Sequence, residues 1–501
     1  MSYLHSLKQK NSEMLTLNGA KNWSTTGNAC LDLFAVAGGM RYRKPVELIR
    51  LFERAYIEEP DTAMKLLFYI RDIRGGMGER KIFRTLIRHV AKVWPESAKK
   101  NICLISEYGR FDDLFCLLGT PAEEEVLKVV RAQLDADLAS FEERKKGNPN
   151  AHISLLAKWM PSINTSSPKT RALAYRLANA LGMKPVQYRK TLTALRANIC
   201  LTERYLSQKR PEKVQYSAVP AGAMLKHCQT FARQDPQRFN DYIRSVRFSD
   251  DRIHAETLYP FEIIRPFLRG NGWNPVSSPN HSNVLEALWE KLPNEVSSEN
   301  AMCVVDTSGS MFWTSKGQIA PAYVALSLGL YHAERCKGVF HNHFMTFESA
   351  PHLMRIHGKT LEDKLRYIAG APWDGSTDLE AVFDLLLETA IQSNASQDEM
   401  PSTLYIISDM EFNCAVRDPD KTVFQNAVNL FSAYGYVLPA VVFINVNSWQ
   451  MHTPVRAHER GTALMSGASV HSFKERCDFN TTPLDHMYKI LLSDRYKEVH
   501  A

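Results

Sequence analysis

The hydrophobic periodicity of the sequence changes near residue 300, and this change limits the fold more than any other feature. From about residue 28 to residue 246, apolar side chains recur every three or four positions, which predicts amphipathic helices. After residue 300, short apolar runs alternate with helical patterns. These runs predict strands over residues 301–306, 339–347, 403–409 and 438–446. We therefore expect an α-helical domain over residues 1–295 and an α/β domain over residues 296–501, with a mostly parallel, Rossmann-like sheet.

Two segments of the helical part resemble each other. AGGMRYRKPVELIR (37–50) and RGGMGERKIFRTLIR (74–88) share Gly-Gly-Met, then Arg-Lys, then an apolar helix. Their offset is near the period of stacked helix pairs, so we expect HEAT-like helical repeats. The simpler interpretation is that each glycine pair ends a helix in the left-handed conformation.

The cysteines and the apolar runs exclude several classes of protein. The nine cysteines form no CxxC pair, so we expect neither a disulfide framework nor a zinc ribbon. The first 14 residues lack the apolar core of a signal peptide, and no apolar run approaches the roughly 18 residues that span a bilayer. A cytoplasmic protein without a membrane segment is the expectation.

Charge is distributed unevenly along the chain. Residues 1–300 carry a net charge of +13 and residues 301–501 a net charge of −6, while residues 151–200 hold eight Lys or Arg and no Asp or Glu. With Trp159, Tyr175 and Tyr188 nearby, such helices can neutralise phosphates and stack unpaired bases. A solvated helix face is the alternative. Arg196 is the last of the eight cations of this segment. The candidate RNA-binding residues are His152, Lys158, Lys169, Arg171, Arg176, Lys184, Arg189 and Lys190, with Arg71, Arg74, Arg80, Lys81, Arg110 and Arg204.

An oxygen-only set of side chains follows the predicted strands. Asp306, Ser308 and Ser310 stand at the end of the first strand, Thr377 precedes a helix, and Asp409 closes the strand TLYIIS. Hard oxygen ligands with few charges suit Mg²⁺, and such an ion can recruit a carboxylate or phosphate from a partner. Each piece also has a simpler interpretation: Ser310 as a helix N-cap, and Thr377 within a capping box.

This order of residues resembles the metal-ion-dependent adhesion site of von Willebrand factor A (vWA) domains, D-x-S-x-S, then Thr, then Asp. The resemblance implies that Ser308, Ser310 and Thr377 bind the ion directly. Asp306 and Asp409 would act directly or through water. Asp374 and Glu411 lie outside this pattern and are expected to support the site or to face solvent.

A competing zinc site would use His341 and His343, which alternate onto one face of the strand VFHNHF, with His332 as a third ligand. No ligand at recognisable spacing completes it. Hydrogen-bonded, partly buried histidines are the simpler expectation.

Further motifs resemble the TROVE-domain proteins, the Ro autoantigen and its bacterial relatives. His152-Ile-Ser-Leu-Leu followed by Pro161-Ser162 is similar to one family segment, and Arg252-Ile253-His254 before PFEII to another. RDIRGGMGER, GRFDDL, AKWMPS and ERYLSQKR are similar to an uncharacterised TROVE-like family with a C-terminal vWA domain. The resemblance implies a monomeric ring of helical repeats closed by the vWA domain. Single-stranded RNA ends would enter its centre near His152, and small structured RNAs would bind outside.

These observations favour a non-catalytic, RNA-binding ribonucleoprotein whose Mg²⁺ module contacts a partner. The alternative is a protein-interaction scaffold in which the Mg²⁺ site binds an acidic residue of a partner and RNA has no part. Catalysis is not expected, because the metal set includes no positioned general base, and RGGMGER lacks the Lys-Ser/Thr ending of a phosphate loop.

Overall fold

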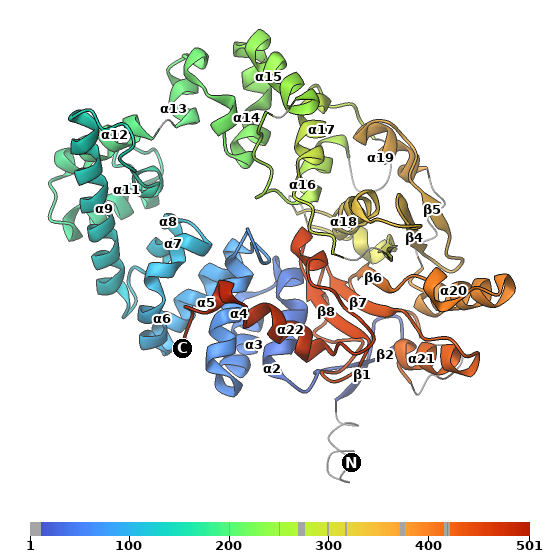
Figure 1. Cartoon of the computed structure of the whole chain (residues 1–501). Helices are drawn as coiled ribbons and strands as arrows, with labels where there is room; N and C mark the ends of the chain where they lie inside the picture. The colour runs from blue at the N-terminus through green and yellow to red at the C-terminus, as the bar shows by residue number, and fades with distance from the viewer. Residues whose placement is uncertain are drawn as a thin grey trace.

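The computed structural model describes residues 12–199, 201–249, 251–268, 276–297, 300–315, 318–370, 376–414, 418 and 421–501. The chain is largely helical, with one six-stranded mixed sheet, and its elements follow one another around a ring (Figure 1). Within those ranges, no helix is long and apolar enough to cross a membrane.

The predicted helical part consists of short helices, many of which begin with proline. Proline suits the first turn because its fixed φ matches the helix and its missing N–H has no intrahelical partner there. The elements are α2 (Ala29–Val36), η1 (Ala37–Met40), α3 (Pro45–Glu58), α4 (Pro60–Arg71), α5 (Arg80–Val93), α6 (Pro95–Lys100), η2 (Ile102–Leu104), α7 (Ile105–Tyr108), α8 (Phe111–Leu114), η3 (Phe115–Leu117), α9 (Glu123–Lys145), α10 (Leu156–Trp159), α11 (Pro168–Ala180), α12 (Pro185–Asn198), α13 (Thr202–Ser207), η4 (Pro211–Lys213), η5 (Tyr216–Ala218), α14 (Ala221–Gln234), α15 (Pro236–Phe248), α16 (Pro260–Ile264), η6 (Arg265–Phe267) and α17 (Ser282–Glu290).

The second part alternates strands and helices, as the sequence predicts. Its elements are β3 (Ala301–Asp306), η7 (Gly309–Phe312), α18 (Pro321–Arg335), β4 (His343–Phe347), β5 (Leu353–Arg355), α19 (Leu361–Ala369), α20 (Leu379–Ser393), η8 (Gln397–Glu399), β6 (Thr403–Ser408), α21 (Val423–Ala433), β7 (Ala440–Asn445), β8 (Thr462–Ser466), η9 (Val470–Phe473), α22 (Pro483–Leu491) and η10 (Asp494–Tyr496). The sequence analysis missed β5, a short partly exposed edge strand, and β8, a run of only five residues.

The sheet has the strand order β5-β4-β3-β6-β7-β8. All neighbours are parallel except β4 and β5, which pair antiparallel. Every residue of β3, β6, β7 and β8 is buried, so both faces of the sheet centre are covered. This is the doubly wound order, in which the chain leaves β3 toward one edge for two strands and then returns to the other side.

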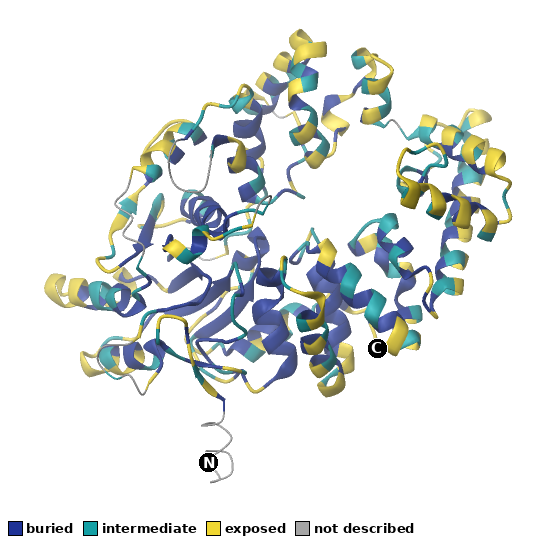
Figure 2. Cartoon of the chain, turned by 180° about the vertical axis from the view of Figure 1, so that it is seen from behind, coloured by how far each residue is buried: buried dark blue, intermediate teal, exposed yellow. Residues whose placement is uncertain are grey.

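The helical part contacts the sheet part at both of its ends. At one end α2 packs against β8 and α22, and at the other α16 and α17 pack against α18 and α19. In Figure 1 the helices between these two contacts form the arc that completes the ring. Figure 2 shows that burial is densest around the sheet and α2–α5, whereas the helices across the ring expose much of their surface.

Both chain ends cross to the other part of the molecule. The N-terminal hairpin, β1 (Glu13–Leu15) and β2 (Lys21–Trp23), lies on the sheet part through bridges from Gly19 to Asn413 and from Trp23 to Thr453. The C-terminal tail returns to α4 and α6, where the Asn101 amide donates to the His500 carbonyl at 2.5 Å.

The tail is fixed by a buried carboxylate. Asp72 is completely buried and accepts hydrogen bonds from the Arg495 guanidinium, at 2.8 Å from Nη2, and from the Tyr496 hydroxyl at 3.1 Å. The hydrogen bond to Asp72 raises the pKa of Arg495 above its usual range. Because a buried carboxylate is costly without a partner, this contact favours the closed arrangement.

The glycine pairs are explained by close packing rather than by helix ends. A β-carbon on Gly38 would lie 2.4 Å from the Gly467 backbone, and one on Gly76 would lie 2.1 Å from the Tyr69 carbonyl oxygen. Neither pair has positive φ, so the left-handed helix end proposed as the simpler interpretation is wrong. The two similar segments thus share a requirement for close backbone contact.

We predict that Arg495→Ala weakens the attachment of the tail. The variant leaves the Asp72 carboxylate with fewer partners in a buried place, so it should cost about 2 kcal/mol. Urea unfolding should show a lower midpoint, and limited proteolysis should release the tail sooner. Lys497→Ala, which removes an exposed cation two residues away, is the control; equal midpoints for the two variants would contradict the prediction.

Candidate metal centre and basic surface

The predicted metal ligands lie where the two halves of the sheet diverge. Asp306 ends β3, which pairs with β4 on one side and β6 on the other, and Asp409 follows β6 directly. In open α/β sheets this point leaves a crevice at the carboxyl ends of the strands, where ligands bind.

Asp306 is completely buried, and hydrogen bonds hold both of its carboxylate oxygens. The Ser408 hydroxyl donates to Oδ2 at 2.5 Å, and the Ser308 backbone N–H donates to Oδ1 at 2.8 Å. Burial raises the pKa of Asp306 above its usual range, although these two hydrogen bonds oppose the rise. The carboxylate is therefore fixed in direction but poorly solvated.

Asp409 is the second buried carboxylate, only 1% exposed. Its Oδ1 accepts from the Glu411 backbone N–H at 3.2 Å, while its Oδ2 is buried without a hydrogen-bond partner among the described residues. Burial and the nearby charge of Asp306 raise the pKa of Asp409, and the hydrogen bond from the Glu411 backbone N–H opposes them. No cationic side chain contributes to either pKa shift. The charged forms of the two buried carboxylates therefore repel each other without compensation from a positive side chain.

Hydroxyl groups complete the cluster. The Ser308 and Ser310 hydroxyl oxygens lie 3.1 Å apart. Thr377 is 1% exposed and donates through its hydroxyl toward the Glu411 carbonyl at 2.9 Å, in the loop that follows Asp409. The structure therefore brings all five predicted residues to one edge of the sheet.

The N-terminal hairpin contributes side chains that the sequence analysis missed. The Asn18 amide donates to the Thr377 hydroxyl at 3.0 Å and to the Glu411 carbonyl at 2.7 Å. The Glu411 carboxylate accepts from the Leu17 backbone N–H at 2.7 Å and lies 3.1 Å from His452 Nε2. No local pattern links residue 18 to residue 377, so only tertiary structure could reveal this contact.

Of the two acidic residues outside the predicted ligand pattern, Glu411 is buried and holds the hairpin beside the site. It therefore supports the site and does not face solvent. Asp374 lies outside the described residues.

The five side chains fit a hard divalent cation. They offer only oxygen, two of them are carboxylates with raised pKa, and the Asp409 Oδ2 has no other partner among the described residues. Among the same residues, no three His, Cys, Asp or Glu side chains come together in a group that could hold a metal ion. The candidate site depends instead on three hydroxyl groups.

The competing zinc site is not formed by the described residues. The His341 Nδ1 bonds the Cys336 carbonyl at 2.9 Å, and His343 Nδ1 bonds the His341 carbonyl at 2.8 Å. His332 is completely buried, with its ring 5.0 Å from the rings of both Tyr405 and Phe473. His341 and His343 are hydrogen-bonded, as the simpler expectation has it. His332 differs from it, because the ring is completely buried and neither nitrogen has a hydrogen-bond partner among the described residues.

Most of the predicted RNA-binding residues are exposed, and they concentrate on α11 and α12. The exposed residues are His152, Lys169, Arg171, Arg176, Lys184, Arg189, Lys190, Arg74, Arg80 and Lys81. Tyr175 is also exposed, at 47%. Arg176 forms an ion pair with Glu123 at 2.6 Å, so its charge is partly neutralised.

Two predicted cations and one predicted aromatic residue are structural instead. Arg71 is buried and pairs with Asp113 at 2.8 Å. Arg196 donates to the carbonyls of Ala157 and Met160 and to the Ser162 hydroxyl. Tyr188 is buried, and its hydroxyl donates to the Pro161 carbonyl at 2.9 Å. Placing these three residues at an RNA surface was wrong, because sequence spacing does not tell a solvated cation from one that satisfies buried oxygens.

Three further predicted cations are partly buried. Arg110 lies over the Trp159 ring at 3.9 Å and pairs with Asp112 at 2.8 Å. Lys158 lies 3.9 Å from the Glu203 carboxylate. Arg204 is also only partly exposed. These side chains have less freedom to meet a ligand than those of α11 and α12.

The structure shows a basic groove on α5, of which the sequence analysis assigned only Arg80 and Lys81. A hollow of about 590 Å³ is lined by Arg80, Lys81, Arg84, Arg88 and Lys92. Arg84 pairs with Asp112 at 2.7 Å, so part of its charge is neutralised. Burial and the positive charges of Arg110 and Arg84 lower the pKa of Arg80. The spacing of four residues along α5 could have identified this stripe.

Family models match both parts of the chain. One, described as a domain of unknown function (DUF2828), matches residues 16–131 and 124–302, more than half of the chain. The chain belongs to the DUF2828 family. A second model, described as a domain of unknown function (DUF7788), matches residues 300–480.

Two comparisons cover nearly all of the chain. Uncharacterized protein L728 of Acanthamoeba polyphaga mimivirus is 29% identical over 512 residues, which cover 95% of this chain and 86% of that protein. The crystal structure of the Deinococcus radiodurans RO (RSR) protein is similar with a TM-score of 0.39 and 13% identity, over 94% of this chain and 93% of that one.

We predict that His332 makes the protein sensitive to acid. Burial lowers its pKa from 6.5 to about 3, so below pH 6.5 the unfolded chain binds a proton that the folded chain does not. Stability should therefore fall as the pH drops from 6.5 toward 3, by at most about 1.4 kcal/mol per pH unit from this residue. Urea midpoints measured across this range should fall less steeply for His332→Phe. The exposed His458→Phe is the control, and parallel curves for wild type and His332→Phe would disprove the assignment.

Proposed function

We propose that this protein binds RNA without catalysis, through the exposed basic faces of α11 and α12. The observation that carries the proposal is the exposure of Lys169, Arg171, Lys184, Arg189 and Lys190 in a segment that has no acidic side chain. Such a surface attracts a polyanion, and the phosphates of a nucleic acid are the most regular array of anions that it can meet.

Single-stranded or structured RNA fits these helices better than duplex DNA. The exposed Tyr175 on α11 and the Trp159 ring beside Arg110 are aromatic groups close to the cations. Unpaired bases stack on such rings, whereas bases in a duplex are already stacked. The groove on α5 offers a second basic surface, with room for a phosphate backbone.

We infer that the sheet part is a vWA-like module and the helical part a HEAT-like arc, in one monomeric ring located in the cytoplasm. The doubly wound strand order and the cluster at its switch point support the first assignment. The contacts of both helical ends with the sheet part support the ring. The whole would act as a ribonucleoprotein.

Mg²⁺ is the proposed ion of the switch-point site, that is, the cluster of Asp306, Ser308, Ser310, Thr377 and Asp409 where the two halves of the sheet diverge. Ser308, Ser310 and Thr377 would bind it directly, and Asp306 and Asp409 would do so directly or through water. Once bound, the ion would supply a positive charge that attracts a carboxylate or phosphate. The chain's own residues orient this site: Ser408 fixes Asp306, and Asn18 holds Thr377 beside the loop after Asp409.

The second candidate is a protein-interaction scaffold without RNA, favoured by the same carboxylate cluster. An acidic residue of a partner protein would then meet the Mg²⁺ ion, and the basic helices would be only a solvated surface. The two candidates separate experimentally, because the first requires α11 and α12 and the second requires Asp306 and Asp409.

We predict that reversing four exposed charges abolishes RNA binding. Lys169→Glu, Arg171→Glu, Lys184→Glu and Arg189→Glu together should weaken binding of a labelled single-stranded RNA by more than a hundredfold at low salt. If all four residues contact phosphates, the slope of log K against log salt should also become shallower by roughly 3. Fluorescence anisotropy at several salt concentrations measures both quantities.

The control applies the same change of charge to the sheet part and the tail. Lys337→Glu, Arg355→Glu, Lys359→Glu and Lys497→Glu reverse four exposed cations elsewhere. This variant should keep nearly all RNA binding. Equal losses in the two variants would mean that net charge, and not the α11–α12 surface, attracts RNA.

We predict that Mg²⁺ stabilises the protein through Asp409. A bound ion stabilises by about 2.7 kcal/mol when its concentration is 100 times its Kd, so the melting temperature should rise with added MgCl₂. Asp409→Asn should remove this rise. Without divalent ions the variant should melt no lower than wild type, because it removes one of two competing buried charges.

Asp398→Asn, which changes an exposed carboxylate of η8, is the matched control and should keep the response to Mg²⁺. MnCl₂ provides a second probe of the same site. A rise of equal size in Asp409→Asn and wild type would place the ion elsewhere.

A further inference from the structure

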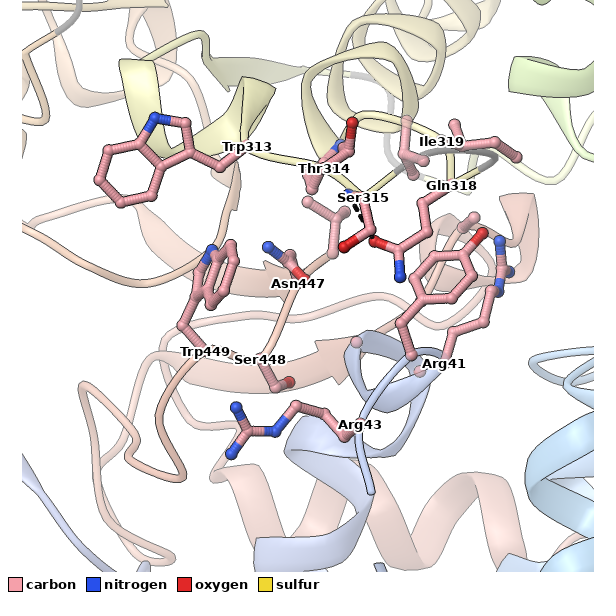
Figure 3. A pocket seen from close by; sticks show the side chains of 18 of the residues that line it. Arg41, Arg43, Trp313, Thr314, Ser315, Gln318, Ile319, Asn447, Ser448 and Trp449 are labelled. Atoms are coloured by element: carbon pink, nitrogen blue, oxygen red, sulfur yellow. Dashed lines mark hydrogen bonds between the residues drawn. The ribbon is translucent and has the colours of Figure 1, made fainter. Parts of the chain in front are cut away.

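A pocket of about 570 Å³ lies at the seam between the helical part and the sheet (Figure 3). Three regions form its walls: residues 38–47 before and within α3, residues 313–315 and 318–324 after the Ser308–Ser310 loop, and the turns that follow β7 and β8. It therefore opens at the carboxyl end of the sheet but uses none of the five candidate metal ligands.

Two tryptophans form one side of this pocket. The rings of Trp313 and Trp449 meet edge to face, with centroids 6.4 Å apart and an interplanar angle of 81°. Trp313 is 64% exposed, which is unusual for so large an apolar side chain. The Trp449 indole N–H is buried and has no hydrogen-bond partner among the described residues. The pair thus offers an exposed aromatic face and an unused donor.

Polar groups lie opposite and between these rings. Figure 3 shows the Asn447 side chain in the middle of the pocket, with Gln318 and Ser315 on the side away from the tryptophans. The Asn447 amide makes no side-chain hydrogen bond within the described part of the chain, and Gln318 uses only its oxygen, which accepts from the Ser315 backbone N–H at 3.1 Å. Amides with free donors and acceptors can read the edge of a nucleobase.

The wall formed by residues 38–47 is basic. Lys44 is exposed, and Arg43 pairs with Glu47 at 2.8 Å. Arg41 is held by buried Glu79 and lies 5.5 Å from the rings of Tyr259 and Phe261, so it is a fixed part of the wall. Lys44 is the exposed cation of this wall, and Arg43 can reach an anionic group if it exchanges its surface pair with Glu47.

We propose that this pocket binds one ribonucleotide. The base would stack on the exposed ring of Trp313, with Trp449 beside it, and would meet the amides of Asn447 and Gln318. The phosphate would lie toward Lys44 and Arg43. An exposed aromatic ring suits the face of a base, an amide suits its edge, and a nearby cation suits the phosphate of a nucleotide. No bond is made or broken in this step.

The nucleotide can come from two sources: a free mononucleotide, or an unpaired residue of an RNA strand. The second source rests on the proposed function, whereas the first does not. Because the pocket residues differ from those of α11 and α12, the two ideas can fail separately.

The experiment measures binding of AMP, GMP, UMP and CMP to the full chain by calorimetry, with ribose 5-phosphate as the probe that lacks a base. An eight-residue single-stranded RNA, and the same strand with abasic residues, form the second arm. We expect at least one base-bearing probe to bind at least tenfold more tightly than its baseless counterpart. Binding of a mononucleotide identifies the free source, and binding of the octamer alone identifies RNA.

Trp313→Ala should weaken the binding of that probe about tenfold, because stacking on one ring is lost. Trp313 is exposed, so the variant should fold normally. Phe479→Ala, an equally exposed aromatic residue outside the pocket, should leave affinity unchanged. Trp449→Phe keeps an aromatic face but removes the indole N–H, and it should alter the preference among bases.

Equal affinity with and without a base, no binding by any probe at millimolar concentration, or unchanged affinity in Trp313→Ala would each overturn the proposal. If RNA binding is lost in the α11–α12 variant but unaffected in Trp313→Ala, the proposed function stands and the pocket assignment fails. If a mononucleotide still binds to the α11–α12 variant, and no RNA binds to wild type, the pocket stands and the proposed function fails.

Discussion

The buried carboxylate of Asp72 is the constraint on which the closed molecule depends. It lies in the turn after α4, yet the Arg495 guanidinium and the Tyr496 hydroxyl that bind it are more than 400 residues away in sequence. A carboxylate that is shielded from water needs such hydrogen-bond partners, and the C-terminal tail supplies them by returning to the first helices. β8 and α22 pack directly against α2, and with the tail contacts at α4 they form one of the two seams of the ring.

The same seam explains features that look unrelated in the sequence. Gly38 and Gly39 permit close contact with the Gly467 backbone and with Ser448, where a β-carbon would collide. Gly75 leaves room for the Arg495 side chain. The similar glycine pairs of the two segments therefore serve the joining of the first helices with the C-terminal part, and the tryptophan-lined pocket is the space that this joining leaves.

The switch-point cluster is electrostatically unfavourable, because it buries two carboxylates close to each other. Asp306 and Asp409 are both buried, and burial raises the pKa of each. Hydroxyl and backbone donors compensate part of this cost, and the Asn18 side chain brings a third segment to the same place. Such conflict between local rules is typical of functional sites, where a ligand or ion completes the set.

Basic residues take two different roles within one segment. Arg196 is fixed because its planar group can satisfy two carbonyls and a hydroxyl at once, whereas the lysines of α11 and α12 keep their ammonium groups in water. A count of positive charges cannot separate these roles. The exposed set on α11 and α12 is smaller than the charge pattern predicts, but it is concentrated on adjacent helices.

The sequence by itself determined that a helical part precedes an α/β part, where four of the strands lie, and the order of the five candidate metal ligands. Periodicity and strand-end motifs depend on nearby residues, so they can be read from the sequence. It also predicted the basic character of residues 151–200. Only the tertiary structure decided that Arg71 and Tyr188 are buried and that Arg196 bonds two backbone carbonyls. It also decided that Asn18 reaches Thr377 and that Trp313 meets Trp449. These facts depend on contacts between residues from 27 to 359 positions apart in sequence. Such contacts leave no periodic signal, because each is made by a few individual groups and not by a repeated pattern.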